Sequence, residues 1–146
     1  MAKLGEAEIR SRLDGIPVVR LATVGPSGLP HLVVTTFALA GDQIFMAVDH
    51  KPKATRDLKR LRNIRINPQV AVLADHYEDD WERLWWARAD GLARVIEGEP
   101  EMAHPIDLLV QRYAQYKRHR PAGPVIALTV THWTGWTYIS ADPSIT

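Results

Sequence analysis

The positively charged side chains of this sequence are concentrated in one short stretch, residues 51–65. The stretch holds seven of the chain's 18 lysines and arginines and a single acid, Asp57. Guanidinium and ammonium groups at a strand-to-helix junction can hold a phosphate, helped by the amides of the helix N-terminus. We therefore expect an anion-binding site here, and the alternative is a solvated helix face without a ligand. The cations are Lys51, Lys53, Arg56, Lys59, Arg60, Arg62 and Arg65.

Nucleic acid is a second class of anion that such a stretch could bind. Contact along a phosphate backbone needs a broad positive surface. The formal net charge of the whole chain is only +1, so the residues outside the stretch are net negative. A compact anionic ligand therefore fits the charge distribution better than a long polyanion. We expect neither a nucleic-acid nor a membrane partner.

Hydroxyl and indole side chains give the second chemical signal. Thr35 and Thr36 lie together in an otherwise apolar segment, where they are either simple β-formers or hydrogen-bond partners for the polar edge of a heterocycle. The chain has five tryptophans, and their default role is to pack in the core or at an interface. Some of them could instead form the walls of a site for a flat conjugated ligand. They are Trp81, Trp85, Trp86, Trp133 and Trp136.

Motifs of several common enzyme classes are missing from the sequence. It has no glycine-rich dinucleotide fingerprint, no P-loop and no nucleophile elbow. It has no cysteine, and its six histidines are scattered without ligand spacing, so we expect no metal site. No catalytic residue can be assigned from spacing alone.

The elements that must position these residues follow from hydrophobic periodicity. A hairpin made by strands at 17–24 and 29–39, with a third strand at 43–48, predicts antiparallel pairing. Further strands are expected at 69–75, 84–97, with a bulge or bend at Gly91, and 125–140. Helices are expected at 3–13, 53–65 and 106–117, and the second carries one apolar stripe made by Ala54, Leu58, Leu61 and Ile64. The predicted fold is mainly β with flanking helices (α+β), built on about six strands that close into a small barrel.

Length and composition bound the remaining possibilities. A chain of 146 residues with 46% hydrophobic and 24% charged residues suits one domain, which we expect to span residues 1–146. Apolar stretches reach about nine residues, whereas a bilayer span needs about 20. Glu6 and Glu8 stand where a signal peptide would be apolar, and cysteine is absent, so a cytoplasmic location is expected.

Several segments, taken in order, resemble the pyridoxamine 5′-phosphate oxidase superfamily of flavin and deazaflavin oxidoreductases. The likeness covers about residues 17–139, and it is closest to the branch that uses the deazaflavin coenzyme F420. It is carried by Val19–His31 (VRLATVGPSGLPH), Thr35–Phe37 (TTF), Asp49–Lys53 (DHKPK), Leu61–Ala71 (LRNIRINPQVA), His76–Trp81 (HYEDDW), Leu84–Gly91 (LWWARADG) and Thr134–Trp136 (TGW).

The resemblance implies a six-stranded antiparallel split β-barrel, of the FMN-binding type, that forms a homodimer with its cofactor in a groove at the subunit interface. It implies that the cofactor's anionic groups contact the basic stretch and that its ring lies on the second and third strands. A tryptophan of the last strand would approach from the other subunit. The implied cofactor-binding residues are Val34, Thr35, Thr36, Ala47, Val48, Lys51, Lys53, Arg56, Arg60, Arg62 and Trp136.

The expected function is F420-dependent transfer of a hydride between the deazaflavin and a small conjugated organic acceptor. F420 carries a phosphodiester and an oligoglutamate tail, so a run of seven cations suits it better than a smaller phosphate clamp. Hydride chemistry is supplied by the cofactor, which is consistent with the lack of an acid–base motif. The alternatives are an FMN-binding oxidase or reductase of the same fold and a non-catalytic F420-binding carrier.

Overall fold

The computed structural model describes residues 2–48 and 58–138. Its strands form one antiparallel sheet in the order β3-β2-β6-β7-β8-β5-β4, and the short β1 pairs with β8 outside that path. The strands are β1 (Ala2–Lys3), β2 (Val19–Val24), β3 (Pro30–Thr35), β4 (Ala38–Ala40), β5 (Gln43–Ala47), β6 (Gln69–His76), β7 (Trp85–Ile96) and β8 (Val125–Thr137). The helices are α1 (Glu6–Asp14), α2 (Lys59–Ile66), α3 (Ala103–Arg112) and α4 (Ala114–Arg118), with a short 3₁₀ turn, η1 (Trp81–Arg83).

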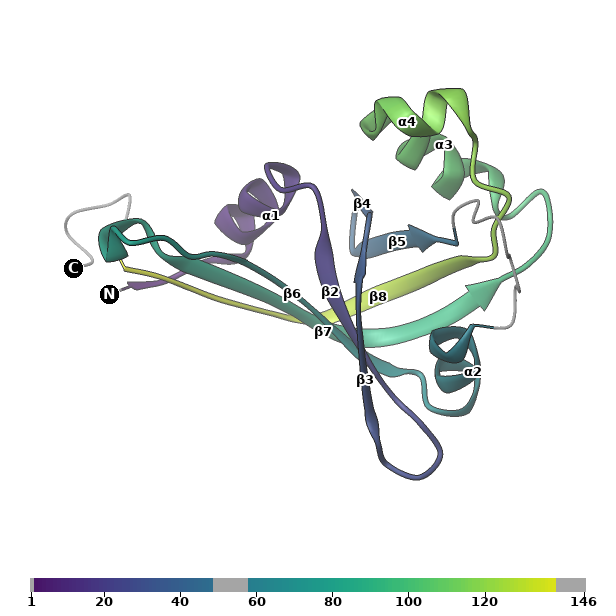
Figure 1. Cartoon of the computed structure of the whole chain (residues 1–146), viewed down its shortest axis with the longest axis horizontal. Helices are drawn as coiled ribbons and strands as arrows, with labels where there is room; N and C mark the ends of the chain where they lie inside the picture. The colour runs from purple at the N-terminus through teal and green to yellow at the C-terminus, as the bar shows by residue number, and fades with distance from the viewer. Residues whose placement is uncertain (1, 49–57, 139–146) are drawn as a thin grey trace.

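The sheet is strongly curved, and its two edge strands are neighbours in sequence (Figure 1). The edges are β3 and β4, and only Thr36 and Phe37 separate them. The chain therefore crosses from one edge of the sheet to the other within two residues, which we call the β3–β4 bend. At one end β6, β7 and β8 extend into a long arm that carries α1, and at the other end α3 and α4 cover β4 and β5 (Figure 1).

The structure confirms the predicted architecture, divides one predicted strand in two and adds one short strand. The expected second strand, residues 29–39, is two strands because the chain bends at Thr36 and Phe37. The sequence analysis did not anticipate β1, whose two residues pair with Thr137 and Trp136. These changes turn about six predicted strands into an eight-stranded sheet.

Helix α2 is positioned by an apolar stripe and by one buried polar contact. Leu61 and Ile64 are buried in the core, as the predicted stripe requires. Asn63 is also buried, and its Nδ2 donates to Thr23 Oγ1 on β2 at 3.0 Å. This hydrogen bond satisfies both buried groups and fixes α2 against the β2–β3 hairpin. Ala54, the first residue of the predicted stripe, lies outside the described residues.

The predicted third helix is broken at Tyr113 and begins earlier than expected. Pro105 lies in the first turn of α3, where its missing amide hydrogen costs no intrahelical bond. Tyr113 has an extended backbone, with φ −115° and ψ 117°, and separates α3 from α4. Its hydroxyl is within hydrogen-bond distance of three backbone groups of Pro17 and Phe37. Periodicity within the segment could not reveal the break because these partners lie far away in sequence.

Gly91 is the site of an irregularity in the sheet, as predicted. The register between β7 and β8 shifts between Asp90 and Gly91. A Cβ atom at position 91 would lie 2.0 Å from the carbonyl oxygen of Thr129. The two backbones approach too closely there for any side chain on residue 91.

The core consists of two clusters on opposite faces of β5 and β8, because alternate residues of these two strands belong to different clusters. The larger contains residues of α1, α2 and most strands, among them Ile9, Leu21 and Leu61. The smaller joins α3 to β4, β5 and β8 through Phe45, Leu109 and neighbouring side chains. Within residues 2–48 and 58–138, no helix has the length and apolar character needed to cross a lipid bilayer.

Candidate functional site

A small hollow of about 50 Å³ lies where the β3–β4 bend, the end of β5 and the first turn of α2 meet. Its wall combines apolar side chains with one guanidinium group and two threonines. Six of the residues predicted to bind the cofactor line it, and Leu58 completes the wall. The predicted residues are Val34, Thr35, Thr36, Ala47, Val48 and Arg60.

The two threonines of the hollow have different roles. Thr35 ends β3, is buried, and donates its hydroxyl to the carbonyl oxygen of Thr36 at 3.0 Å. Thr36 is half-buried in the bend, and its Oγ1 lies 2.7 Å from the hydroxyl of Tyr116 on α4. The prediction placed both hydroxyls in the middle of one strand. The structure instead makes Thr35 a backbone-bonded residue and leaves Thr36 as the hydroxyl presented at the bend.

Arg60 brings positive charge to the hollow, and Arg60 and Lys59 also act on His31 of β3. Burial is the larger cause that lowers the pKa of His31, and the positive charges of Lys59 and Arg60 lower it further. His31 lies across from Thr23, on the side of the hairpin that faces α2. Its Nδ1 is buried and has no hydrogen-bond partner. This end of β3 therefore faces two cations with an unsatisfied imidazole.

Of the remaining predicted cofactor residues, the two that the structure describes, Arg62 and Trp136, lie away from this hollow within one chain. Lys51, Lys53 and Arg56 lie outside the described residues. Arg62 is exposed on α2 and does not line the hollow. Trp136 lies on the arm, where its backbone pairs with Trp86 and Lys3 and its ring meets Tyr138 edge to face. The resemblance assigned Trp136 to the hollow of a second subunit, and that assignment stays a prediction.

Three residues beside the hollow were not predicted as part of the site. Leu58 belongs to the stripe that was assigned to the core, and its position just before α2 also gives it a place in the wall. His31 was treated as one scattered histidine, although it lies only four residues before Thr35 on the same strand. Tyr116 carried no sequence signal, because it is 80 residues from Thr36.

The outer face of the β3-β2-β6-β7 part of the sheet is open and largely apolar. Cross-strand pairing aligns Val34, Arg20, Leu73 and Arg88 in one row. Leu32 is 67% exposed and Val34 59% exposed, although both lie in the interior of a strand. A broader hollow of about 600 Å³ on this face is lined by Arg20, Leu32, Leu73, Asp75, Tyr77, Trp86 and Arg88.

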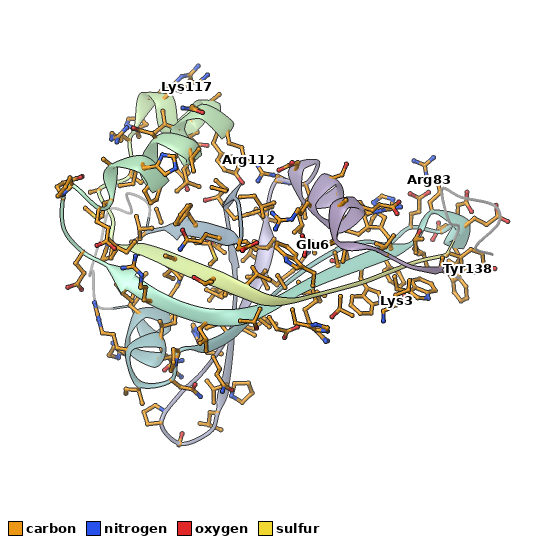
Figure 2. All side chains as sticks on the ribbon, turned by 180° about the vertical axis from the view of Figure 1, so that it is seen from behind. Lys3, Glu6, Arg83, Arg112, Lys117 and Tyr138 are labelled. Atoms are coloured by element: carbon orange, nitrogen blue, oxygen red, sulfur yellow. The ribbon has the colours of Figure 1, made fainter. Side chains whose placement is uncertain are left out.

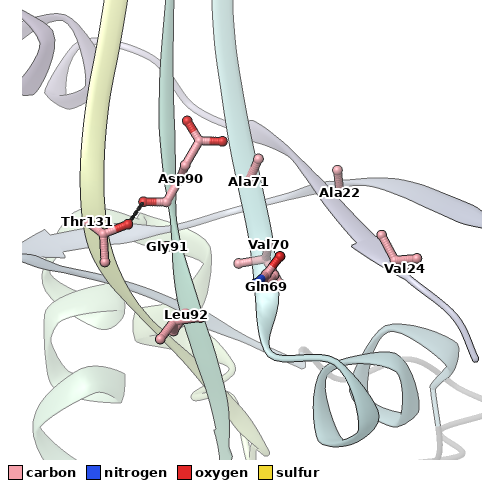
Figure 3. A pocket seen from close by; sticks show the side chains of 9 residues that line it. All are labelled: Ala22, Val24, Gln69, Val70, Ala71, Asp90, Gly91, Leu92 and Thr131. Atoms are coloured by element: carbon pink, nitrogen blue, oxygen red, sulfur yellow. Dashed lines mark hydrogen bonds between the residues drawn. The ribbon is translucent and has the colours of Figure 1, made fainter. Parts of the chain in front are cut away.

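A third hollow, of about 410 Å³, lies on the same face beside the bulge at Gly91 (Figure 3). The Thr131 hydroxyl donates to the carbonyl oxygen of Asp90 at 3.2 Å, and the Asp90 carboxylate pairs with Arg88. The side chains of Thr131 and Asp90 are thus engaged in local contacts. Among the residues the structure describes, no group of three histidine or acidic side chains could hold a metal ion.

Comparison with solved structures shows the same fold in several proteins of low sequence identity. A protein from Bacteroides thetaiotaomicron assigned to 5-nitroimidazole antibiotic resistance aligns with a TM-score of 0.73 and 15% identity, covering 92% of this chain and 86% of its own. An FAD-binding protein from Mesorhizobium loti aligns with a TM-score of 0.68 and 17% identity, covering 92% of this chain and 93% of its own. The heme storage protein HutZ from Vibrio cholerae aligns with a TM-score of 0.67 and 18% identity, covering 88% of this chain and 92% of its own. At these identities the likeness establishes the fold alone.

Sequence comparison gives the family. No curated protein matches the chain. The family model described as pyridoxamine 5′-phosphate oxidase matches residues 6–137, which include every described strand of the sheet except β1. The chain belongs to the pyridoxamine 5′-phosphate oxidase family and has its antiparallel split-barrel fold.

Proposed function

We propose that this protein is an oxidoreductase that binds a flavin-type cofactor, with one edge of the ring system in the hollow beside Thr36. The observation that carries the proposal is the composition of that hollow. Apolar side chains, a hydroxyl and a guanidinium group converge there from three separate elements. Such a mixture suits a planar heterocycle that has an apolar face, a polar edge and an anionic substituent.

The small size of the hollow supports the proposal that a second copy of the chain completes the site. Sites that bury a cofactor-sized ligand enclose roughly 300–1,000 Å³. The hollow offers about 50 Å³ and can therefore receive only an edge of the ring. Val34 is mostly exposed, lies in its wall, and also belongs to the apolar outer face of the sheet. We propose that a partner subunit packs on this face and closes the site from outside.

The cofactor we propose is F420, and FMN is the alternative. The charge of residues 51–65 favours F420, because its phosphodiester and oligoglutamate tail can use more cations than one phosphate can. The FAD-binding protein with the same fold favours the flavin alternative. Both cofactors have a tricyclic ring, a ribityl-type chain and a phosphate, so the proposed ring position is the same for both.

The residues of this chain contribute binding and orientation in the proposed reaction. Thr36 offers a hydroxyl to the polar edge of the ring, and Arg60 offers charge to the anionic part. Val48 and Leu58 exclude water from the ring face. Two-electron hydride chemistry belongs to the cofactor when it is bound. We propose a small conjugated organic molecule as the acceptor, and the nitroimidazole assignment of one structural neighbour is in keeping with that class.

Parallel fluorescence titrations with F420 and FMN test the cofactor assignment. We expect F420 to bind more tightly than FMN, and tight FMN binding without F420 binding would overturn the preferred cofactor. Thr36→Val should weaken binding of either cofactor by several-fold, because it removes one hydrogen bond while keeping the side-chain shape. Thr129→Val, exposed on β8 and outside all three hollows, is the matched control and should leave the affinity unchanged.

A turnover assay separates an enzyme from a carrier. One neighbour with this fold is a heme storage protein, so the fold alone does not decide between catalysis and binding. Reduced F420 should be oxidised by at least one member of a broad panel of nitro-aromatic, quinone and enone acceptors. Tight binding with no oxidation by any acceptor would favour the carrier.

A further inference from the structure

We propose that His31, Lys59 and Arg60 form a subsite that binds the anionic group of the ligand, with His31 taking up a proton when that group arrives. This inference rests on the proposed function, because the subsite continues from the hollow beside Thr36. It adds an imidazole, which can gain a proton, to a site that otherwise holds a lysine and an arginine. The chemical class it would take is a phosphate or phosphodiester.

The position of Arg60 connects His31 to the hollow. Arg60 lines the wall of the hollow, and its charge also acts on His31. His31, Val33 and Thr35 alternate with Leu32 and Val34 along β3, so all three face the α2 side of the strand. Four residues of strand span roughly 13 Å, about the length of a flavin ring edge together with its ribityl chain. A ring at Thr36 would thus place its phosphate near His31.

One ring nitrogen of His31 is an unsatisfied polar atom. Nδ1 of His31 is buried and has no hydrogen-bond partner. Most buried polar atoms in proteins are hydrogen-bonded, so an unpaired one beside a candidate site calls for an explanation. Its cross-strand neighbour Thr23 is already engaged by Asn63. A phosphate oxygen would supply the missing acceptor for a protonated ring.

The charges around His31 would change when an anion binds. Burial and the two cations of α2 lower the pKa of His31, and both effects favour the neutral ring in the ligand-free protein. The charged groups that act on it are Lys59 and Arg60, and its partner across the hairpin, Thr23, is neutral. An anion placed among the three reverses this balance and favours the imidazolium form. Binding is then linked to proton uptake and strengthens as pH falls, by at most about tenfold per pH unit for one proton.

A direct test is the pKa of His31 measured by NMR, with its ring signal identified by loss in His31→Gln. Riboflavin and FMN share a ring and differ in the phosphate. We expect saturating FMN to raise the pKa of His31 by about one unit or more and riboflavin to leave it nearly unchanged. The shift should persist at high salt, where distant charges are screened. His132, exposed on β8, is the internal control and should not respond to either ligand.

Affinity measurements give a second readout that does not depend on the NMR signal. His31→Gln should weaken FMN by several-fold at pH 6 and less at pH 8, and it should leave riboflavin affinity unchanged. Calorimetry in two buffers of different ionisation enthalpy should show that the variant takes up fewer protons on binding FMN, which separates His31 from titration of the phosphate itself.

The outcomes distinguish this inference from the proposed function. If FMN binds in the hollow while the pKa of His31 stays the same, the subsite is wrong and the proposed function stands. If no flavin binds, the proposed function is wrong, and a titration with inorganic phosphate then tests the subsite by itself. A rise in the pKa of His31 with inorganic phosphate, absent when Arg60 is replaced by alanine, supports it, and an unchanged pKa overturns it.

Discussion

The hydroxyl of Tyr116 on α4 lies 2.7 Å from Oγ1 of Thr36, so the helical cap touches the candidate site directly. The contact spans 80 residues of sequence and reaches the bend at which the chain crosses between the two edges of the sheet. Phe37, the next residue, is held by the same cap through Tyr113 and Arg112. The α3–α4 segment therefore sets the conformation of the two residues that present the hollow.

Tyr116→Phe tests this relationship. The change removes one hydroxyl and keeps the ring, so the free energy of unfolding should fall by only about 1 kcal/mol. Thr36 loses the partner that orients its hydroxyl, and riboflavin and FMN should both bind several-fold more weakly. Equal losses for the two ligands indicate an effect on the ring, whereas a loss confined to FMN would contradict the assignment. Tyr138→Phe, on the distant arm, serves as the control.

Arg112, whose side chain is labelled in Figure 2, joins the cap to the end of α1 and to the β3–β4 bend. Its guanidinium donates to the carbonyl oxygens of Leu13, Ile16 and Phe37 and lies over the Phe37 ring at 4.1 Å. Charge-assisted hydrogen bonds contribute about 1.5–3 kcal/mol each, and removing the donor leaves several carbonyls without it. Arg112→Ala should therefore lower the free energy of unfolding by at least about 2 kcal/mol in urea denaturation. Lys117→Ala, exposed on α4, should change it by less than about 0.5 kcal/mol.

Gly91→Ala should be among the most destabilising single substitutions in the chain. The added Cβ would lie 2.0 Å from the Thr129 carbonyl oxygen, and backbone on both strands would have to move. A loss of more than about 3 kcal/mol, or failure to fold, is expected in thermal or urea unfolding. Gly98→Ala is the matched control, since no heavy atom lies within 4 Å of its added Cβ. Similar stabilities for the two variants would show that the bulge geometry is wrong.

Leu32→Glu tests whether the outer face is a subunit interface. Leu32 is 67% exposed in the single chain, so the substitution should hardly affect the folding of one subunit. A buried glutamate at an interface would be strongly disfavoured, and the variant should sediment as a monomer while the wild type sediments as a dimer. Ile66→Glu changes an equally exposed residue at the end of α2 and should leave the dimer intact. A monomeric wild type would refute the proposed completion of the site.

Local patterns in the sequence were sufficient for much of the fold. The stripe of α2 places Leu61 and Ile64 in the core. Adjacent residues of a strand point to opposite faces, so Trp85 packs against the core while Trp86 lies on the outer face. The position of the bulge also follows from the sequence, because glycine is the residue that tolerates such close backbone approach.

Features that depend on contacts between residues far apart in sequence could not be predicted from local patterns. The break in the third helix depends on where the Tyr113 hydroxyl finds its partners, and the β3–β4 bend depends on the same contacts. The resemblance grouped Val34, Thr36, Val48 and Arg60, and the structure brings these residues together around the hollow. The positions of Tyr116 and His31 beside it could not be predicted, because they depend on α4 meeting the bend and on α2 meeting the hairpin.

The crystal structure of the protein saturated with F420 is the most direct test of the central claim. We predict the polar edge of the deazaflavin within hydrogen-bond distance of the Thr36 hydroxyl and the phosphodiester against the side chain of Arg60. A cofactor bound instead in the broader hollow lined by Trp86 and Arg88, with Thr36 and Arg60 untouched, would contradict the account.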